Sequence, residues 1–492
     1  MSVAQILSFL TDCGVEPRGV ADDSRQVLPG DVFLAYPGAL ADGRGFIADA
    51  IKRGAQAVIW QPGGDFAWDP AWTVPNLALA GLRPLAGPLA HAVYQHPSES
   101  LSLIAITGTN GKTTVSQCLA QAYPRPCAVV GTLGAGFPGA LRETGFTTPE
   151  ATVLMRYLAD FRDQGAAACA LEASSIGIEE CRMNGLRVDV AVFTNLTRDH
   201  LDYHGTMAAY AAAKEKLFHW PRLRTAIINL DDEFGIHLMR ESSAMRLIGY
   251  SCAEPRRDFP ALVRAENITP TPFGQRFELV MPNGRCLVDT SLPGQYNISN
   301  LLACAAVLYD AGVMPAEIAR RLSELNPPAG RMQSLGGVGE PLVVVDYAHT
   351  PDALEKALRA LRPLAAARGG ALVVVFGCGG DRDPGKRPEM GRLAQACADQ
   401  VWLTSDNPRS ESALAIIEAI REGATAAMVE PDRGAAIRAA CAAAADQDVI
   451  LVAGKGHENY QEVAGERRAF SDPAEALAAL ELRRLTGRER AS

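Results

Sequence analysis

The sequence predicts an α/β protein of three domains, in which parallel sheets are covered by helices. Short uninterrupted apolar runs alternate with helix-favouring amphipathic stretches from Leu101 onward, which is typical of parallel strands buried on both faces. The length of 492 residues suggests about three domains. Turn-rich breaks near His96–Ser98 and Asn326–Gly330 divide the chain. We therefore expect a small N-terminal α/β domain, a central parallel-sheet domain and a C-terminal Rossmann-like α/β domain, at 1–98, 99–328 and 329–492.

The composition is that of a globular protein in the cytoplasm. Hydrophobic residues make up 48% of the chain, and the net charge of −9 argues against a nucleic-acid partner. No apolar run approaches the ~18 residues that suggest a membrane span. Met1–Pro17 lacks the basic region and cleavage site of a signal peptide. The 11 cysteines contain no C-x-x-C pair, which indicates buried reduced thiols rather than zinc or disulfides.

The apolar runs predict individual strands in chain order. In the first domain they lie at Asp31–Ala35 and Ala57–Trp60. In the central domain we expect strands at Leu103–Thr107, Ala168–Glu172, Asp189–Thr194 and Thr225–Asn229, with a helix at Thr206–Phe218. In the last domain the strands are expected at Leu342–Asp346, Leu372–Phe376, Gln400–Thr404 and Val449–Ala453.

The stretch IAITGTNGKTT, from Ile104 to Thr114, predicts a nucleotide-binding loop. A buried strand gives way to a turn with Gly108 and Gly111, and Lys112 then opens a helix. Backbone N–H groups, a helix N-terminus and a lysine directed at one spot suit a polyphosphate. The strict Walker A spacing is absent, because Ile106 occupies its first glycine position. A glycine-rich turn with an ordinary exposed lysine is the alternative. The order of the elements favours ATP.

Two polar clusters follow later strands of the central domain. Glu172 ends a strand, where a carboxylate is well placed to hold Mg²⁺, although a surface glutamate that caps the next helix is the simpler account. The segment 195–205 carries His200 and His204 on one helical face. Zinc is not favoured, because the H-E-x-x-H pattern is missing, and one histidine beside Mg²⁺ is the better hypothesis. Lys214, taken alone, indicates a solvated lysine.

Three further clusters follow strands of the last domain, at Gly377–Asp383, Asp406–Arg409 and Gly454–Glu458. Because the carboxyl ends of parallel strands meet at one edge, these clusters are expected to converge. A dinucleotide site is not supported, since Arg382 stands where G-x-G-x-x-G requires its last glycine. The arginines favour recognition of a carboxylate, and hence an anionic or zwitterionic small substrate.

Together these motifs resemble the Mur ligase family of peptidoglycan synthesis, in the family's order from Ser24 to Glu458. The marks shared across the family are TGTNGKT, NLTRDHLDYHG and the lysine of AAAKEK. DSR near the N-terminus, GDRDPGKRP, DNPR and GKGHE resemble the branch that completes the UDP-linked tripeptide. DNPR is the form associated with adding meso-2,6-diaminopimelate rather than L-lysine.

The resemblance implies an ATP-dependent amide ligase. ATP would phosphorylate the terminal carboxylate of UDP-N-acetylmuramoyl-L-alanyl-D-glutamate, and the amine of diaminopimelate would displace the phosphate. The ATP-binding residues would be Gly108, Thr109, Asn110, Gly111, Lys112, Thr113, Thr114, Asn297, Asn300, Arg331 and Asp346. The Mg²⁺ ligands would be Thr113, Glu172 and His200. Lys214 as a carbamate would hold a second Mg²⁺, which replaces the solvated interpretation of Lys214. Lys112, Lys214, His200 and Glu172 would be catalytic.

The resemblance also assigns the other two substrates. The UDP-linked substrate would contact Ser24, Ala39, Leu40, Ala41, Thr147, Thr148, Ser174, Glu180 and Arg182. Diaminopimelate would contact Arg382, Asp406, Asn407, Pro408, Arg409, Gly454 and Glu458. The chain departs from the family at Ile176, Glu180 and Ala39–Leu40, where histidine, glutamine and a polar pair are usual. The carboxylate of Glu180 is unfavourable near an anionic substrate unless it is paired.

Several other functions fit these motifs less well. The lysine-adding ligase of the same family lacks the arginine of DNPR, and folylpolyglutamate synthase leaves GDRDPGKRP and DNPR without a role. A P-loop nucleotide switch would need an N-K-x-D motif, which the chain does not contain. A non-catalytic scaffold would not explain the polar residues at strand ends. A monomer with small-molecule substrates is expected.

Overall fold

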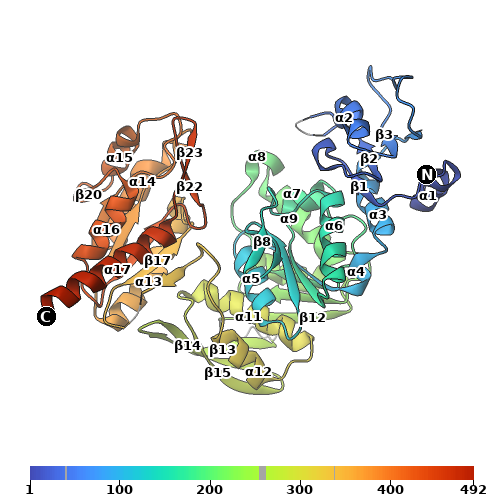
Figure 1. Cartoon of the computed structure of the whole chain (residues 1–492). Helices are drawn as coiled ribbons and strands as arrows, with labels where there is room; N and C mark the ends of the chain where they lie inside the picture. The colour runs from blue at the N-terminus through green and yellow to red at the C-terminus, as the bar shows by residue number, and fades with distance from the viewer. Residues whose placement is uncertain (39–40, 254–261, 337, 492) are drawn as a thin grey trace. The chain divides into compact units, whose positions relative to one another are not determined.

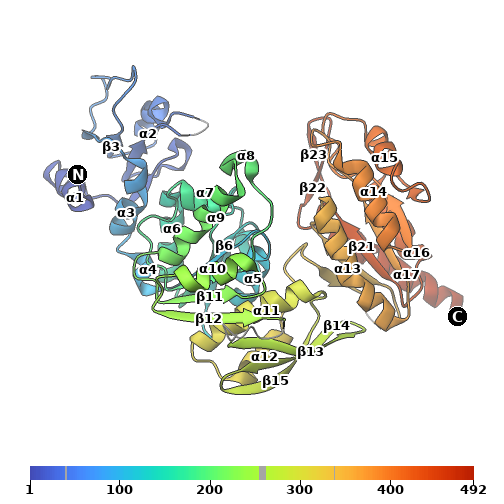
Figure 2. The same cartoon turned by 180° about the vertical axis from the view of Figure 1, so that it is seen from behind.

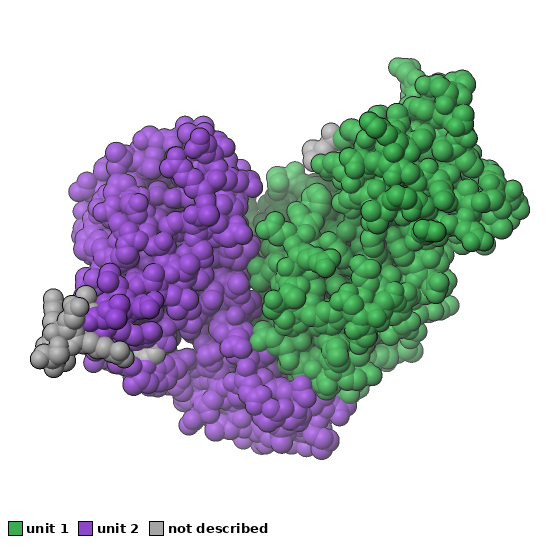
Figure 3. Space-filling view, in the orientation of Figure 1, with its two compact units in different colours: residues 1–250, 256–261, 306–311 green, residues 251–255, 262–305, 312–492 purple. Residues whose placement is uncertain are grey.

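The computed structural model describes residues 1–38, 41–253, 262–336 and 338–491, with the side chains of these up to 485. The chain forms two compact units, drawn in green and purple in Figure 3. Of the described residues, unit 1 contains 1–250 and 306–311, and unit 2 contains 251–253, 262–305 and 312–491. The predicted domain boundaries at 98 and 328 stay predictions.

The N-terminal part of unit 1 is a parallel four-stranded sheet in the order β1-β2-β3-β4 (Figure 1). Its strands are β1 (Gly19–Ala21), β2 (Asp31–Ala35), β3 (Ala57–Trp60) and β4 (Asn76–Ala78). Its helices are α1 (Val3–Asp12), η1 (Ser24–Gln26), η2 (Gly43–Phe46), α2 (Ile47–Lys52) and α3 (Arg83–Val93). A capping box starts α1, because the Ser2 hydroxyl accepts from the Gln5 N–H while the Gln5 side chain accepts from the Ser2 N–H.

The central sheet of unit 1 has the order β12-β11-β10-β5-β9-β6-β7-β8, and neighbouring strands pair in parallel except for β6 with β7 and β7 with β8. The strands are β5 (Ser102–Thr107), β6 (Cys127–Gly131), β7 (Gly134–Phe137), β8 (Ala140–Arg142), β9 (Ala168–Glu172), β10 (Val190–Phe193), β11 (Thr225–Asn229) and β12 (Arg246–Ser251). The helices, seen from both sides in Figures 1 and 2, are α4 (Pro97–Ser100), α5 (Lys112–Ala122), α6 (Ala151–Asp163), α7 (Ser175–Glu179), α8 (Leu201–His204), α9 (Met207–Glu215), η3 (Lys216–His219) and α10 (Glu233–Glu241).

One continuous apolar core joins the two sheets of unit 1. Two polar contacts reinforce it: Arg156 on α6 pairs with the buried Asp31 at 3.0 Å, and the Thr152 hydroxyl donates to Asp22 at 2.7 Å. The close packing needs Gly87 on α3, because a Cβ there would overlap the Asn184 carbonyl. The N-terminal sheet is therefore packed firmly on the central one.

Unit 2 begins with an antiparallel sheet of β13 (Val263–Thr271), β14 (Gly274–Met281) and β15 (Gly284–Thr290). The helices α11 (Gln295–Asp310) and α12 (Pro315–Ser323) follow. A second sheet has the order β16-β17-β21-β18-β19-β20, parallel except for β16. Its strands are β16 (Gln333–Leu335), β17 (Leu342–Asp346), β18 (Leu372–Phe376), β19 (Gln400–Leu403), β20 (Met428–Val429) and β21 (Val449–Ala453). A hairpin of β22 (Tyr460–Val463) and β23 (Glu466–Ala469) completes the unit.

Helices cover both faces of this second sheet. They are α13 (Pro351–Arg368), α14 (Lys386–Cys397), α15 (Ala413–Arg421), α16 (Arg433–Ala443) and α17 (Asp472–Ala491). Along β18, Leu372 and Val374 pack into the core with α13 to α15, whereas Val373 and Val375 pack into the core with α16 and α17. This alternation explains why the strands are apolar at every position.

The prediction of an α/β fold with parallel sheets is confirmed. The predicted strands agree with the observed ones to within one residue at each end. The predicted helix 206–218 is shorter, because α9 ends at Glu215 and a 3₁₀ turn follows. None of the described helices combines the length and apolar character needed to cross a bilayer.

Candidate active site

The predicted nucleotide-binding loop connects β5 to α5, which begins at Lys112. Gly111 caps this helix at φ 89°, a left-handed conformation that favours glycine. The loop is fastened to the segment after β10, because the N–H groups of Thr109 and Asn110 donate to Asn195 at 2.8 and 2.9 Å. The geometry presents a helix N-terminus that follows a glycine turn, as phosphate binding requires.

Gly108→Ala is expected to weaken ATP binding at least tenfold. Gly108 has φ 149°, and a Cβ there would overlap the Thr194 side chain, so the loop must move or remain strained by about 1–3 kcal/mol. Titration calorimetry with ATP measures the effect. Gly165→Ala is the matched control, since Gly165 also has positive φ (83°) but no atom lies within 4 Å of a Cβ added there. An unchanged ATP affinity in Gly108→Ala would contradict the role of the loop.

Both predicted catalytic lysines contact this loop. The Lys112 ammonium donates to the carbonyls of Gly108 and Thr109 at 2.8 and 2.9 Å. Lys214, from α9, donates to the same Gly108 carbonyl at 2.9 Å. Two lysines that are 102 positions apart in the chain therefore meet at one backbone oxygen.

Lys214 is buried, with 1% of its surface exposed, and its Nζ lies 4.4 Å from the centre of the Tyr210 ring. Burial lowers the pKa of Lys214 well below its ordinary value, and the charge of Lys112 lowers it further. The solvated interpretation drawn from this lysine alone is therefore wrong. Its amine is predisposed to be neutral, which is the state that reacts as a nucleophile.

Glu172, at the end of β9, is completely buried. Its carboxylate accepts hydrogen bonds from the Thr113 hydroxyl at 2.9 Å and from the Thr132 N–H and hydroxyl at 3.0 and 3.1 Å. Within the described part of the chain no lysine, arginine or histidine forms an ion pair with it. The alternative of a surface glutamate capping the next helix is wrong, and a buried carboxylate with only neutral donors suits a cation.

No hydrogen bond or ion pair between described residues joins His200 to Glu172 or Thr113. His200 has φ 50°, its ring centre lies 6.0 Å from that of Tyr210, and 43% of its side chain is exposed. His204 instead shares a hydrogen bond of 2.9 Å with the Ser175 hydroxyl. Among the described residues, no three His, Cys, Asp or Glu side chains form a group that could hold a metal. A metal at Glu172 therefore needs oxygen ligands from elsewhere, such as substrate phosphates.

Four of the residues predicted to contact the UDP-linked substrate form two bonded pairs, Thr148 with Ser174 and Arg182 with Glu180. Thr148 bonds both the Glu172 carbonyl and the Ser174 hydroxyl, at 2.7 and 2.9 Å. Arg182 is buried and pairs with Glu180 at 2.6 Å and with Glu150 at 3.1 Å. The unusual Glu180 is thus paired, which removes the expected conflict with an anionic substrate.

The remaining described residues of this set also belong to unit 1. The Thr147 hydroxyl is 3.0 Å from that of Thr132. Ser24 is buried at the start of η1, and the Ala41 carbonyl accepts from the Gly38 N–H. Ala39 and Leu40 lie outside the described residues.

The predicted adenosine and γ-phosphate residues belong to unit 2. Asn297 and Asn300 are buried on α11 and joined by a 3.2 Å hydrogen bond. The Arg331 guanidinium lies 4.9 Å from the Tyr347 ring centre, and its buried Nε has no hydrogen-bond partner among the described residues. Burial raises the pKa of Asp346, although Arg331 and two backbone N–H groups oppose the shift.

The strand-end clusters of unit 2 converge as predicted. Asn407, after β19, donates to Glu458, after β21, at 2.8 Å. Arg409 is half-buried at φ 51° and donates to the Gly380 carbonyl, after β18, at 2.7 Å. Gly454 has φ 120°, and a Cβ there would lie 2.5 Å from the Asp406 carboxylate. Arg382 is exposed, and Pro408 is buried between Asn407 and Arg409.

The sequence analysis did not single out four residues that form hydrogen bonds with the site residues or with the backbone beside them: Thr132, Tyr210, Arg433 and Lys455. Thr132 follows β6, so its strand-end position was a usable signal, and Lys455 stands inside GKGHE between two glycines. Tyr210 and Arg433 lie on helices and carry no local signal.

The chain is similar to known proteins along nearly its whole length. Three family models match: the Mur ligase family catalytic domain at 17–94, the Mur ligase middle domain at 106–308 and the Mur ligase glutamate ligase domain at 330–456. Proteins named UDP-N-acetylmuramoyl-L-alanyl-D-glutamate–2,6-diaminopimelate ligase are similar over nearly the whole chain. The one from Janthinobacterium sp. (strain Marseille) is 47% identical over 99% of this chain and 98% of its own. The one from Pseudomonas aeruginosa is 50% identical over 94% and 95%.

A solved structure of the same name is 36% identical, covers 95% of both chains and superposes with a TM-score of 0.72. The resemblance inferred from the motifs is confirmed, and the chain belongs to the Mur ligase family.

Proposed function

We propose that this chain is the ATP-dependent ligase that adds meso-2,6-diaminopimelate to UDP-N-acetylmuramoyl-L-alanyl-D-glutamate, in the cytoplasm and as a monomer. The observation that carries the proposal is the convergence of Asp406–Arg409 and Gly454–Glu458 at one end of a parallel sheet. These loops offer a guanidinium and a carboxylate, which complement the carboxylate and ammonium groups of diaminopimelate. Relatives that are 47–50% identical over nearly full length carry this reaction in their names.

The reaction joins a carboxylate to an amine through an acyl phosphate. A carboxylate oxygen of the UDP-linked substrate attacks the γ-phosphorus of ATP, and ADP leaves. The free amine of diaminopimelate then attacks the acyl carbon, and inorganic phosphate leaves with the bonding electrons. The proton that the attacking nitrogen carries passes to a base or to water.

Residues of unit 1 serve the phosphates and the UDP-linked substrate. The loop from Gly108 to Thr114 and the N-terminus of α5 bind the ATP phosphates, through backbone N–H groups other than those of Thr109 and Asn110, which donate to Asn195. Lys112 turns from its loop carbonyls to the phosphates. Thr147, Thr148, Ser174 and Arg182 orient the UDP-linked substrate. Ser24 and residues 39–41 contact its uridine end. Glu180 contributes by its ion pair with Arg182, which holds that guanidinium in place.

Residues of unit 2 serve adenosine and the amino acid. Asn297, Asn300, Arg331 and Asp346 contact the nucleotide, and the unpartnered Nε of Arg331 fits a phosphate or ribose oxygen. Arg409 and Arg382 recognise the distal carboxylate of diaminopimelate. Asp406, Asn407, Pro408, Gly454 and Glu458 complete its pocket.

The donor set around Glu172 fits Mg²⁺. The ligands that we propose near Glu172 are its carboxylate and the Thr113 hydroxyl, with substrate oxygens filling other positions. A carbamate on Lys214 would hold a second Mg²⁺, and His200 is proposed as a further ligand although no hydrogen bond or ion pair joins it to Glu172 or Thr113 among the described residues. When bound, Mg²⁺ neutralises charge on the phosphates during transfer.

Phosphate release tests the proposal directly. The purified chain is given ATP, Mg²⁺ and UDP-N-acetylmuramoyl-L-alanyl-D-glutamate, with meso-diaminopimelate and L-lysine in separate reactions. We expect release with diaminopimelate and little with lysine. Release with lysine would keep the ligase and overturn the role of Arg409. No release with either would reject the substrate assignment, and folate-type acceptors would then be tried.

A further inference from the structure

A buried cation links the two loops of the amino-acid pocket. Lys455 is completely buried, and its Nζ donates to Asn407 Oδ1 at 3.0 Å and to Glu458 Oε2 at 2.9 Å. It lies between Gly454 and Gly456, whose φ values of 120° and 53° bend the chain after β21. A Cβ on Gly456 would lie 2.8 Å from the Gly330 carbonyl and the Tyr347 side chain. The turn is therefore shaped so that the lysine is enclosed.

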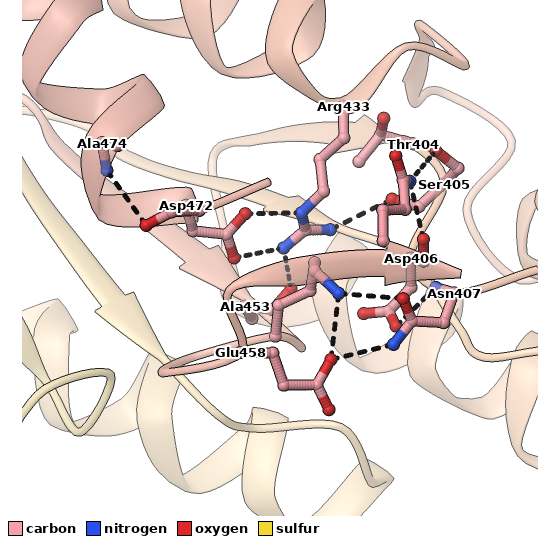
Figure 4. A network of polar contacts seen from close by, with 12 residues as sticks. Thr404, Ser405, Asp406, Asn407, Arg433, Ala453, Glu458, Asp472 and Ala474 are labelled. Atoms are coloured by element: carbon pink, nitrogen blue, oxygen red, sulfur yellow. Dashed lines mark hydrogen bonds and ion pairs between the residues drawn. The ribbon is translucent and has the colours of Figure 1, made fainter. Parts of the chain in front are cut away.

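The contacts of Lys455 give Glu458 one orientation. Glu458 Oε2 accepts from both Lys455 and Asn407 Nδ2, at 2.9 and 2.8 Å. Asn407 Oδ1 also accepts from the Glu462 N–H at 2.9 Å, which fixes which way the amide faces. Glu458 Oε1 has no partner among the described residues, and Figure 4 shows this oxygen pointing away from the network. One carboxylate oxygen is thus held while the other remains available to a ligand.

A second buried cation, Arg433, anchors the backbone at the start of both pocket loops. Arg433 forms a two-pronged ion pair with Asp472 at 2.7 Å, and both side chains are fully buried. The same guanidinium donates to the carbonyls of Ser405 and Ala453, at 3.2 and 2.9 Å (Figure 4). These two residues precede the two pocket loops. The loop backbones are therefore anchored without Lys455, and the charge of Arg433 is already balanced by Asp472.

We propose that Lys455 is a positioning residue of the amino-acid subsite. It holds Glu458 by Oε2 and offsets the charge of that carboxylate, so that Oε1 accepts from an ammonium group of the amino-acid substrate. Because Arg433 is committed to Asp472, Lys455 is the cation that offsets Glu458. This inference rests on the proposed function, since the subsite has a role only if an amino acid binds there.

Lys455→Met tests the inference, because methionine has a similar length but neither charge nor donor. We expect the KM for diaminopimelate to rise about 10- to 100-fold, as the loss of a charge-assisted hydrogen bond predicts. The KM values for ATP and the UDP-linked substrate should stay within twofold. A purely structural role would instead lower kcat and Tm while leaving the three KM values in their wild-type ratio.

Two further variants keep the test decisive. Lys455→Gln retains an N–H donor, should fold if the methionine variant does not, and should raise the KM for diaminopimelate by a smaller factor. Lys356→Met is the matched control, because Lys356 is exposed on α13 and, among the described residues, forms an ion pair with Asp352 alone. Its kinetics should equal the wild type.

These measurements distinguish a failure of the inference about Lys455 from a failure of the proposed function. An unchanged KM for diaminopimelate in a folded Lys455→Met or Lys455→Gln variant overturns the inference and leaves the proposed function in place. Failure of the wild type to turn over diaminopimelate overturns the proposed function, and the positioning role of Lys455 with it.

Discussion

Lys214→Ala is expected to lower kcat by about 100-fold or more, with a small effect on Tm. Burial gives Lys214 a pKa well below that of an exposed lysine, so its amine is neutral at a pH where an exposed amine is protonated. Only the neutral amine reacts with CO₂, and the product is an anionic carbamate able to hold Mg²⁺. Removing one such electrostatic group from a reaction centre costs roughly 10²–10³ in rate.

The measurement compares three proteins in CO₂-depleted and bicarbonate-supplemented buffer. Wild-type activity should fall on depletion and return with bicarbonate, because the lowered pKa leaves more of the Lys214 amine neutral than in an exposed lysine. Lys214→Ala should not respond, although short carboxylates such as acetate should restore part of its activity by replacing the carbamate. Lys216→Ala is the control, since Lys216 is an exposed neighbour that pairs with Glu179. Full activity of Lys214→Ala would exclude the carbamate role.

Arg409→Ala is expected to raise the KM for diaminopimelate by about 10- to 100-fold while leaving the KM for ATP unchanged. A guanidinium recognises a carboxylate through two parallel hydrogen bonds, and the loss of hydrogen bonds to a charged group costs about 1.5–3 kcal/mol. The backbone of Arg409 bonds Glu462 and Ala464, at 3.1 and 2.7 Å. The variant should therefore keep the loop and lose only the side chain.

Steady-state kinetics with diaminopimelate and L-lysine as alternative substrates measure this effect. Selectivity for diaminopimelate over lysine should shrink, because lysine lacks the second carboxylate and gains nothing from Arg409. Arg409→Lys should recover part of the affinity, as it keeps the charge but not the forked geometry. If the KM for diaminopimelate does not change in Arg409→Ala, another residue recognises the distal carboxylate.

Strands and helices could be predicted from the sequence wherever one local property determines the structure of a segment. Uninterrupted apolar runs of five residues, such as Leu372–Phe376, allow little except a strand buried on both faces, and the structure places β18 there. The end of the helix at 206–218 was less predictable. Trp220 precedes Pro221 and is extended (φ −62°, ψ 138°), as a residue before proline prefers, and the chain tightens into a 3₁₀ turn before it.

The site residues divide in the same way. Motif order indicated Lys112, Glu172, Asn407, Arg409 and Glu458, because strand ends and glycine turns are visible in the sequence. The sequence did not indicate which residues would surround each of these side chains. The pairing of Glu180 with Arg182 and the contact of Glu172 with Thr132 depend on how loops after different strands meet.

The sequence by itself determined the alternation of strands and helices, the nucleotide loop and the family to which the chain belongs. Only the tertiary structure decided that Lys214 is buried against Gly108, that Lys455 is enclosed between Asn407 and Glu458, and that Arg433 anchors two loops. The physical reason is that burial and local charge set the protonation and orientation of a side chain. Both arise from residues that are distant in the chain and meet only when it folds.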